Sequence, residues 1–358
     1  MSTFSDLPLL PSLISELSRQ GLKVPTNIQA QTLQALLDDR SVLGVSETGS
    51  GKTLAYVLPL LHKLKSLELG NSSVSSPSRP RGLVLVPTRE LGEQVSKVLK
   101  GLTHTTRLRV RVALGGSKRK IAKQNVAGNF EILVATPGRL TQLIEGEDLY
   151  LDDVRTLIFD EADQMMDPSF LPVARRVIKA CPQKVQIVMF SATLPRSLER
   201  TVSTLFSRPP VCIRTQGAQR VVPTLKTQDL TVHQGRRREP LIDVIEQDPS
   251  VGTIAFANTR AQLDTIAGWL DEESIPYVSY RGQMDRQQRR VNLARFRSGE
   301  VSVLLTTDLG GRGLDIERVA RVINVHLPQD LDNYLHRVGR TARAGREGLV
   351  VNLVTQRD

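Results

Sequence analysis

The sequence has few cysteines, few aromatic residues and no long apolar run, and each scarcity excludes a class of protein. The two cysteines among its 358 residues, Cys181 and Cys212, have neither metal-site spacing nor disulfide density. Aromatic residues make up 4%, with no aromatic and basic segment of the kind that stacks nucleic-acid bases. No apolar run is long enough to span a bilayer, and residues 1–20 lack a secretory or transit pattern. We expect a monomeric cytoplasmic protein with no membrane partner, the nucleus or an organelle being alternatives.

Lysine is absent from residues 229–358, where all 18 basic residues are arginine and balance 18 acidic residues. Residues 1–228 carry 30 basic against 19 acidic residues, so the net charge of +11 lies entirely in this part. Arginine offers a planar fork of donors that stays charged, which suits a phosphate clamp. The composition favours a polyanion as partner, with a solvated surface as the alternative for most of these side chains.

Short apolar runs alternate with helix-like segments along the chain, which is typical of parallel α/β sheets. The first series of predicted strands is 42–45, 82–86, 109–114, 132–135, 156–159, 186–190 and 210–213. The second series is 227–232, 252–256, 277–280, 301–306, 320–324 and 348–354. Residues 214–224 have no apolar period and are predicted to be a linker. We expect two α/β domains, residues 1–219 and 220–358, each a mostly parallel sheet flanked by helices.

A glycine-rich loop follows the first predicted strand, with the sequence Ser46-Glu47-Thr48-Gly49-Ser50-Gly51-Lys52-Thr53. Glycines let backbone N–H groups crowd around phosphate oxygens at the start of a helix. Lys52 is predicted to reach the β and γ phosphates of a nucleotide, and the Thr53 hydroxyl to ligate Mg²⁺. Taken alone, a Gly-Lys-Thr triplet is a weak signal.

A second element strengthens this interpretation. Predicted strand 156–159 ends on Asp160-Glu161-Ala162-Asp163, and open α/β sheets place ligands at that end of their strands. Asp160 is predicted to hold Mg²⁺ through water, and Glu161 to orient and deprotonate the attacking water. The alternative, two acids that cap the next helix, loses weight because both elements occur in order.

With these motifs, the sequence resembles the DEAD-box family of ATP-dependent RNA helicases, part of helicase superfamily 2. Residues 160–163 are the family's namesake motif, and Ser191-Ala192-Thr193 follows a predicted strand as the family's coupling motif does. The resemblance extends from Phe4 to Val354 in family order. It implies two tandem RecA-like domains, ATP and Mg²⁺ as cofactors, and RNA as the partner.

The resemblance assigns an adenine-reading motif to residues 21–29. The amide of Gln29 offers a donor and an acceptor, so it can pair with adenine and reject guanine. Leu22 stands where the family usually has an aromatic residue that stacks on the base, while Phe4 matches a more distant upstream aromatic. The predicted nucleotide contacts are Phe4, Gln29, Thr48, Gly49, Ser50, Gly51, Lys52, Thr53 and Asp315.

A track for the RNA backbone is implied as well. Several of its motifs place hydroxyl, N–H and guanidinium groups at helix N-termini, which are natural phosphate sites. The predicted RNA contacts are Pro87, Thr88, Arg89, Gly115, Gly116, Thr136, Pro137, Gly138, Arg139, Arg260, Gly282 and Thr307. Arg281 replaces a histidine usual in the family. Because aromatic residues are scarce, we expect contacts with sugar and phosphate and little sequence preference.

The last motif is His336-Arg337-Val338-Gly339-Arg340-Thr341-Ala342-Arg343. By resemblance, Arg340 and Arg343 neutralise charge on the γ-phosphate, and His336 completes the catalytic set. The three-residue spacing predicts that the two arginines share one face of a helix. The residues predicted to couple the domains are Asp163, Ser191, Thr193, Arg312 and Arg337.

We therefore predict an RNA-dependent ATPase that unwinds short RNA duplexes locally or remodels RNA–protein complexes, with the proteins of those complexes as possible partners. The main alternative is an ATP-dependent RNA clamp or assembly scaffold with little unwinding, since it would use the same motifs. A DNA helicase is a third hypothesis, which the family resemblance disfavours.

Overall fold

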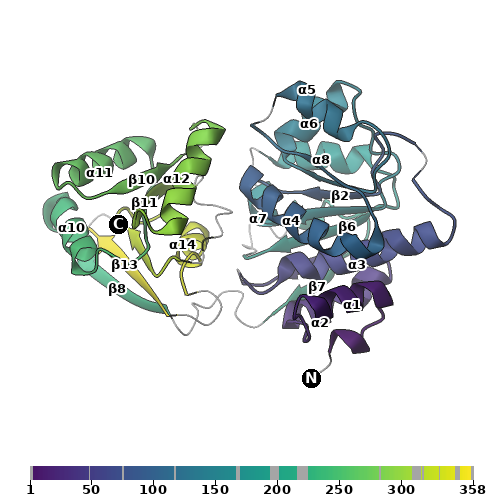
Figure 1. Cartoon of the computed structure of the whole chain (residues 1–358), viewed down its shortest axis with the longest axis horizontal. Coiled ribbons are helices and arrows are strands. Elements are labelled where there is room, and N and C mark those ends of the chain that lie inside the picture. The colour runs from purple at the N-terminus through teal and green to yellow at the C-terminus, as the bar shows by residue number, and fades with distance from the viewer. Residues whose placement is uncertain are drawn as a thin grey trace. The chain divides into compact units, whose positions relative to one another are not determined.

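The structure is a computed structural model of the whole chain (Figure 1). It describes all residues except 1–2, 48, 75, 117, 167–169, 194–200, 216–224, 282–283, 309–315, 317, 330, 343–346 and 356–358, and the side chains of Arg286 and Asp332. The chain divides into two compact units, Met1–Gln219 and Arg220–Asp358. Most of the predicted linker, from residue 216 onward, lies outside the described residues. No described helix is long and apolar enough to cross a bilayer.

The first unit contains a parallel sheet whose strands lie in the order β3-β4-β2-β5-β6-β1-β7. The strands are β1 (Val42–Val45), β2 (Gly82–Leu85), β3 (Val110–Ala113), β4 (Ile132–Ala135), β5 (Thr156–Asp160), β6 (Gln186–Ser191) and β7 (Val211–Arg214). Every residue of β1, β2, β4, β5 and β6 is buried, as expected for parallel strands covered on both faces.

Helices cover both faces of this sheet (Figure 1). One face carries the short turn η1 (Phe4–Asp6) and helices α1 (Pro11–Arg19), α2 (Asn27–Leu37), α3 (Lys52–Leu69) and α4 (Arg89–Thr106). The other face carries α5 (Arg119–Val126), α6 (Pro137–Glu145), α7 (Ala162–Met165) and α8 (Leu171–Ala180). Two apolar cores result, one on each face of the sheet.

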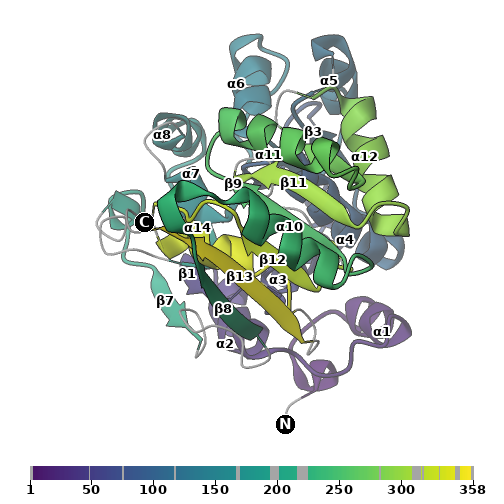
Figure 2. The same cartoon turned by 90° about the vertical axis from the view of Figure 1, so that its left-hand side faces the viewer.

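The second unit repeats this plan with the strand order β10-β11-β9-β12-β13-β8, all pairs parallel (Figure 2). The strands are β8 (Leu225–Thr231), β9 (Thr253–Ala257), β10 (Tyr277–Tyr280), β11 (Val303–Thr307), β12 (Arg321–Asn324) and β13 (Gly348–Val354). Helices α10 (Arg238–Gln247) and α11 (Arg260–Glu272) pack on one face, and α12 (Arg286–Ser298) and α14 (Leu331–Val338) on the other. A short turn, η2 (His233–Gly235), precedes α10.

The predicted α/β fold class is confirmed, and each predicted strand is present with bounds that differ by at most two residues. In a parallel sheet the carboxyl ends of all strands lie at one edge, and the loops that follow them meet there. This edge of each sheet therefore determines which sequence motifs come together.

Candidate nucleotide and RNA sites

The phosphate loop joins the end of β1 to the start of α3. Gly49 and Gly51 have φ angles of +82° and +88°, a conformation that side chains with a Cβ rarely adopt. Gly51 is the N-cap of α3, so the unpaired N–H groups of the first helical turn face the loop. The loop thus has the geometry of an anion site. Thr48, predicted to contribute to it, lies outside the described residues.

The ammonium of Lys52 lies inside this loop. Its Nζ donates to the carbonyl oxygens of Ser46 and Glu47 at 2.7 and 2.8 Å. Burial lowers the pKa of Lys52, and nearby carboxylates, Asp160 foremost, oppose that shift. The structure therefore brings the cation of the first motif next to the acids of the second.

Asp160 and Glu161 stand at the end of β5. Asp160 is 3% exposed, and burial together with the charge of Glu161 raises its pKa to about 6. Glu161 has φ +51° and ψ +53°, a left-handed conformation that costs a non-glycine residue about 1–3 kcal/mol. Such strain is typical of residues whose side chain must point in one direction.

Two residues that sequence analysis did not identify hold these acids. The hydroxyl of Tyr56, on α3, donates to Oδ2 of Asp160 at 2.7 Å. The amide of Gln164 donates to Oε2 of Glu161 at 2.6 Å. Tyr56 follows Thr53 by three positions, and Gln164 follows Glu161 by three. Residues with this spacing are neighbours on a helix, so the sequence could have indicated that they lie beside the predicted site residues.

Gln29, predicted to read adenine, lies beside the phosphate loop. Its Oε1 accepts the N–H of Thr26 at 2.9 Å in a capping box, and its Nε2 donates to the carbonyl of Gly51 at 3.0 Å. A primary amide has two N–H donors and two acceptor lone pairs. These two bonds therefore leave one donor and one lone pair for a base.

The structure does not support the prediction that Phe4 contacts the base. Phe4 is 3% exposed and belongs to the apolar core that contains Leu13 and Leu17 of α1. A ring surrounded by core side chains has no free face on which a base could stack. We therefore assign Phe4 to packing of the core. Leu22, at the position where the family usually has a stacking aromatic residue, is 36% exposed.

The coupling residues of the first unit meet at the end of β6. The Thr193 hydroxyl donates to Oδ2 of Asp163 at 3.2 Å, and the Ser191 hydroxyl donates to the carbonyl of Thr193. The Ser191 carbonyl accepts the N–H of Ser46 at 3.1 Å. A hydrogen-bonded path thus connects residues 160–163, the end of β6 and the phosphate loop.

The RNA motifs of the first unit converge at the ends of the neighbouring strands β2, β3 and β4. Arg89 donates to the carbonyl of Gly115, and the N–H of Gly115 donates to Oγ1 of Thr136 at 3.0 Å. Thr88 caps α4 by accepting the N–H of Leu91 at 3.3 Å. These contacts join three segments of the predicted track, the residues of which are Pro87, Thr88, Arg89, Gly115, Gly116, Thr136, Pro137, Gly138 and Arg139.

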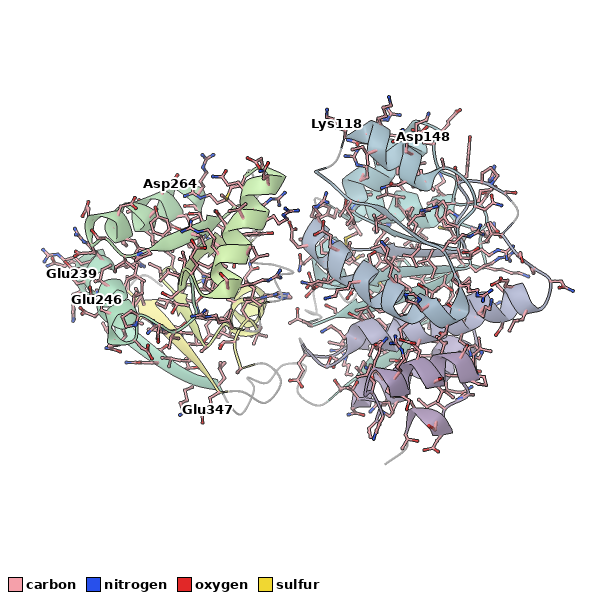
Figure 3. All side chains as sticks on the ribbon, in the orientation of Figure 1. Lys118, Asp148, Glu239, Glu246, Asp264 and Glu347 are labelled. Atoms are coloured by element: carbon pink, nitrogen blue, oxygen red, sulfur yellow. The ribbon has the colours of Figure 1, made fainter. Side chains whose placement is uncertain are left out.

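In the second unit, an open groove of about 1360 Å³ follows the edge strand β10. Arg260, Thr307 and Arg281 line it. Arg281 donates to Asp264 of α11, the residue labelled in Figure 3, and Nε of Arg260 lies 3.8 Å from the other oxygen of the same carboxylate. Two predicted RNA contacts, Arg260 and Thr307, therefore line the same groove. Gly282 lies outside the described residues.

Arg337 does not have the environment expected for a residue that contacts another domain. It is 1% exposed, and its guanidinium donates to Asp308, Asn324, Asn258 and the carbonyl of His326. These bonds use all five N–H donors within the second unit. The structure therefore favours an internal role for Arg337 over the predicted coupling role.

The other residues of the last motif are described only in part. His336 and Arg340 are buried, and Nε of Arg340 donates to the carbonyl of His336 at 3.0 Å. Helix α14 ends at Val338, so the prediction that Arg340 and Arg343 share a helical face is wrong at Arg340. Arg343, Arg312 and Asp315 lie outside the described residues.

Known protein families match both units. The DEAD/DEAH box helicase family matches residues 26–201, and the helicase conserved C-terminal domain matches residues 236–345. The first match contains the phosphate loop and residues 160–163, and the second contains Arg260, Thr307 and the last motif.

Individual proteins match along the whole chain. The ATP-dependent RNA helicase CshA of Listeria monocytogenes is 32% identical over 100% of this chain and 67% of its own length. CshA of Geobacillus kaustophilus, a DEAD-box ATP-dependent RNA helicase, is 31% identical over 100% of this chain and 74% of its own length. Saccharomyces cerevisiae Dbp5 bound to RNA and ADP BeF3 has a similar fold, with TM-score 0.87 and 26% identity over 99% of this chain and 90% of that one. The chain belongs to the DEAD-box family of ATP-dependent RNA helicases.

Proposed function

We propose that this protein hydrolyses ATP when RNA is bound and uses the cycle to unwind short RNA duplexes locally. One observation carries the proposal: the phosphate loop and the Asp160–Asp163 motif follow β1 and β5, the coupling motif follows β6, and the RNA motifs follow β2, β3 and β4 of the same sheet. Their side chains therefore stand at one edge of one rigid element. The protein is expected to act as a cytoplasmic monomer, on free RNA or on RNA–protein complexes.

The first unit supplies the groups that hold and activate ATP. The loop N–H groups and Lys52 bind the β and γ phosphates, and Gln29 contacts adenine. Glu161, held by Gln164 and by its own backbone conformation, accepts the proton of the attacking water. Because this carboxylate is already oriented, little reorganisation precedes the transfer.

The donor set beside this loop fits Mg²⁺. In the described part of the chain, no group of three or more His, Cys, Asp or Glu side chains could hold a metal alone. Mg²⁺ usually binds one or two protein oxygens together with phosphates and water, and the Thr53 hydroxyl and the Asp160 carboxylate supply such oxygens. When bound, the ion neutralises charge on the β and γ phosphate oxygens. Protonation of Asp160, which its raised pKa permits near pH 6, would remove its contribution.

We also propose roles in hydrolysis and RNA binding for residues of the second unit. We propose that Arg340 and Arg343 stabilise the transferring phosphoryl group, with His336 and Arg312 in support and Asp315 at the ribose. Arg260, Gly282 and Thr307 contact the RNA backbone together with the track of the first unit. Hydrolysis then requires nucleotide and RNA to engage both units at once.

A steady-state assay with three nucleic acids tests the function. Single-stranded RNA should accelerate ATP hydrolysis, DNA of the same sequence should do so weakly, and a short RNA duplex should be separated only when ATP is present. Stimulation without strand separation would identify an ATP-dependent clamp instead. Equal stimulation by DNA would contradict the assignment to RNA.

A further inference from the structure

Tyr56 contacts the acid at the end of β5 although no sequence motif contains it. It is on the buried face of α3, one turn after Thr53, and is 1% exposed. Its hydroxyl donates to Oδ2 of Asp160, 104 positions along the chain, at 2.7 Å. Burial raises the pKa of Tyr56, so the phenol keeps its proton at neutral pH and acts as the donor of this bond.

The ring of Tyr56 is held in place by its neighbours. It packs against Phe190 of β6, with ring centroids 5.7 Å apart and planes at 45°. Phe190 in turn fills the space above Gly44 of β1, where an added Cβ would lie 2.5 Å from the Phe190 ring. The position of the hydroxyl is therefore set by the strands of the sheet rather than by a flexible loop.

The Tyr56 hydroxyl is one of two donors that orient the Asp160 carboxylate. Oδ2 accepts the phenol, and Oδ1 accepts the backbone N–H of Glu161 at 3.0 Å. Two donors on different oxygens prevent rotation of the carboxylate plane. Thr53, the other residue that could supply a metal-binding oxygen, lies three positions before Tyr56 on α3.

We propose that Tyr56 is a positioning residue, whose hydroxyl orients the Asp160 carboxylate for Mg²⁺ bound with ATP. This inference rests on the proposed function of the site. Partners that orient metal ligands typically contribute about 10–100-fold to metal affinity or activity. Phenylalanine at position 56 would fill nearly the same volume and keep the contact with Phe190, but it would lose the hydrogen bond to Asp160.

The test is a Tyr56→Phe variant, with Tyr150→Phe as the matched control. Tyr150 is 42% exposed, and its ring contacts the guanidinium of Arg79, which is not a residue of the nucleotide site. Binding of a fluorescent ATP analogue is followed as Mg²⁺ is added, and binding of Mn²⁺ to the protein with ADP is followed by electron paramagnetic resonance. For Tyr56→Phe, the Mg²⁺ concentration at half-saturation should rise about 10-fold or more.

Two further results separate positioning from a merely structural role. Nucleotide affinity without divalent ion should match that of the wild type, and excess Mg²⁺ should restore most of kcat. A Phe190→Leu variant, which keeps the hydroxyl but loosens the ring, should shift the Mg²⁺ requirement in the same direction by a smaller factor. Equal loss of nucleotide affinity with and without Mg²⁺ would overturn the proposal in favour of a packing role.

The wild-type protein distinguishes failure of this inference from failure of the proposed function. If the wild type binds the nucleotide analogue in a Mg²⁺-dependent way but folded Tyr56→Phe has an unchanged Mg²⁺ requirement, only the role of Tyr56 is refuted. If the wild type itself binds no nucleotide, the proposed function fails and the positioning role fails with it.

Discussion

Arg337 and Asp308 form a bidentate ion pair inside the second unit. Nε and Nη2 of the arginine donate to the two carboxylate oxygens at 2.5 and 2.7 Å. Arg337 also lies 5.2 Å from the centre of the Phe256 ring. The pair joins the end of β11 to α14, so it connects the sheet to the helix that begins the last motif.

Replacing Arg337 by methionine should destabilise the second unit by about 3 kcal/mol, because it leaves a partly buried carboxylate and two asparagines without their donor. The sole tryptophan, Trp269, lies on α11 of this unit, so its fluorescence during urea unfolding reports the change. Arg295→Ala, which removes a more exposed pair with Glu300, should cost less than about 1 kcal/mol. Equal stability of Arg337→Met and the wild type would contradict the internal role.

The raised pKa of Asp160 predicts a pH-dependent stability of the first unit. The folded protein holds the Asp160 proton up to about pH 6, while the unfolded chain releases it near pH 4, so this residue stabilises the fold at low pH and loses that effect as pH rises to about 6. Asp160→Asn removes the titration. Relative to the wild type, the variant should therefore gain roughly 3 kcal/mol in unfolding free energy between pH 4 and pH 7.

Circular dichroism in urea, without nucleotide, follows the unfolding of both units. Trp269 fluorescence identifies the transition of the second unit, so the other transition gives the unfolding free energy of the first. Comparing the variant with the wild type at each pH cancels the contributions of other acids, such as Glu16, whose pKa is lowered to about 2 by its bonds to Arg19 and Gln20. If the unfolding free energies of the variant and the wild type differ by the same amount at pH 4 and at pH 7, the pKa of Asp160 is not raised in the folded protein.

The contacts of Asp264 predict that it weakens RNA binding. It pairs with Arg281 and, at a longer distance, with Arg260, and Asp264→Asn would remove this negative charge while an amide oxygen could still accept a hydrogen bond. RNA affinity at low salt should increase by about 2–5-fold, and the slope of affinity against salt should steepen. Fluorescence anisotropy with single-stranded RNA measures both.

Glu246→Gln is the control for net charge, because Glu246 is exposed on α10 (Figure 3). It changes the total charge equally but lies outside the groove of the second unit. If the two variants bind RNA alike, the effect of Asp264 is not local.

The strands were predictable from sequence because parallel strands are buried on both faces and appear as short apolar runs. β1 and β4 match their predicted bounds, whereas the edge strand β3 is only partly buried and is shorter than predicted. Asp160 and Glu161 were predictable because they stand at the end of a strand, and Lys52 because it closes a glycine-rich loop that follows a strand. They meet because β1 and β5 both pair with β6 in a parallel sheet, so the two motifs lie at the same edge.

Side-chain partners far apart in the sequence were not predictable. Tyr56 occurs in a helix rich in apolar residues, where a tyrosine is indistinguishable from a core aromatic until Asp160 is placed beside its hydroxyl. Arg337 was predicted to couple the domains because it lies in the last motif. Only the positions of Asp308 and Asn258 show that its guanidinium is fully used inside the unit.

We propose that Glu161 is the base of an ATPase that RNA activates, and the turnover of a Glu161→Gln variant tests this role. ATP hydrolysis by Glu161→Gln is compared with that of the wild type at saturating RNA, after fluorescence titrations have shown that both bind nucleotide and RNA equally. Glutamine keeps the size of the side chain and a partner for Gln164 but cannot accept the proton of water. Turnover should fall at least about 100-fold. Near-normal turnover by a variant that still binds both ligands would contradict the mechanism.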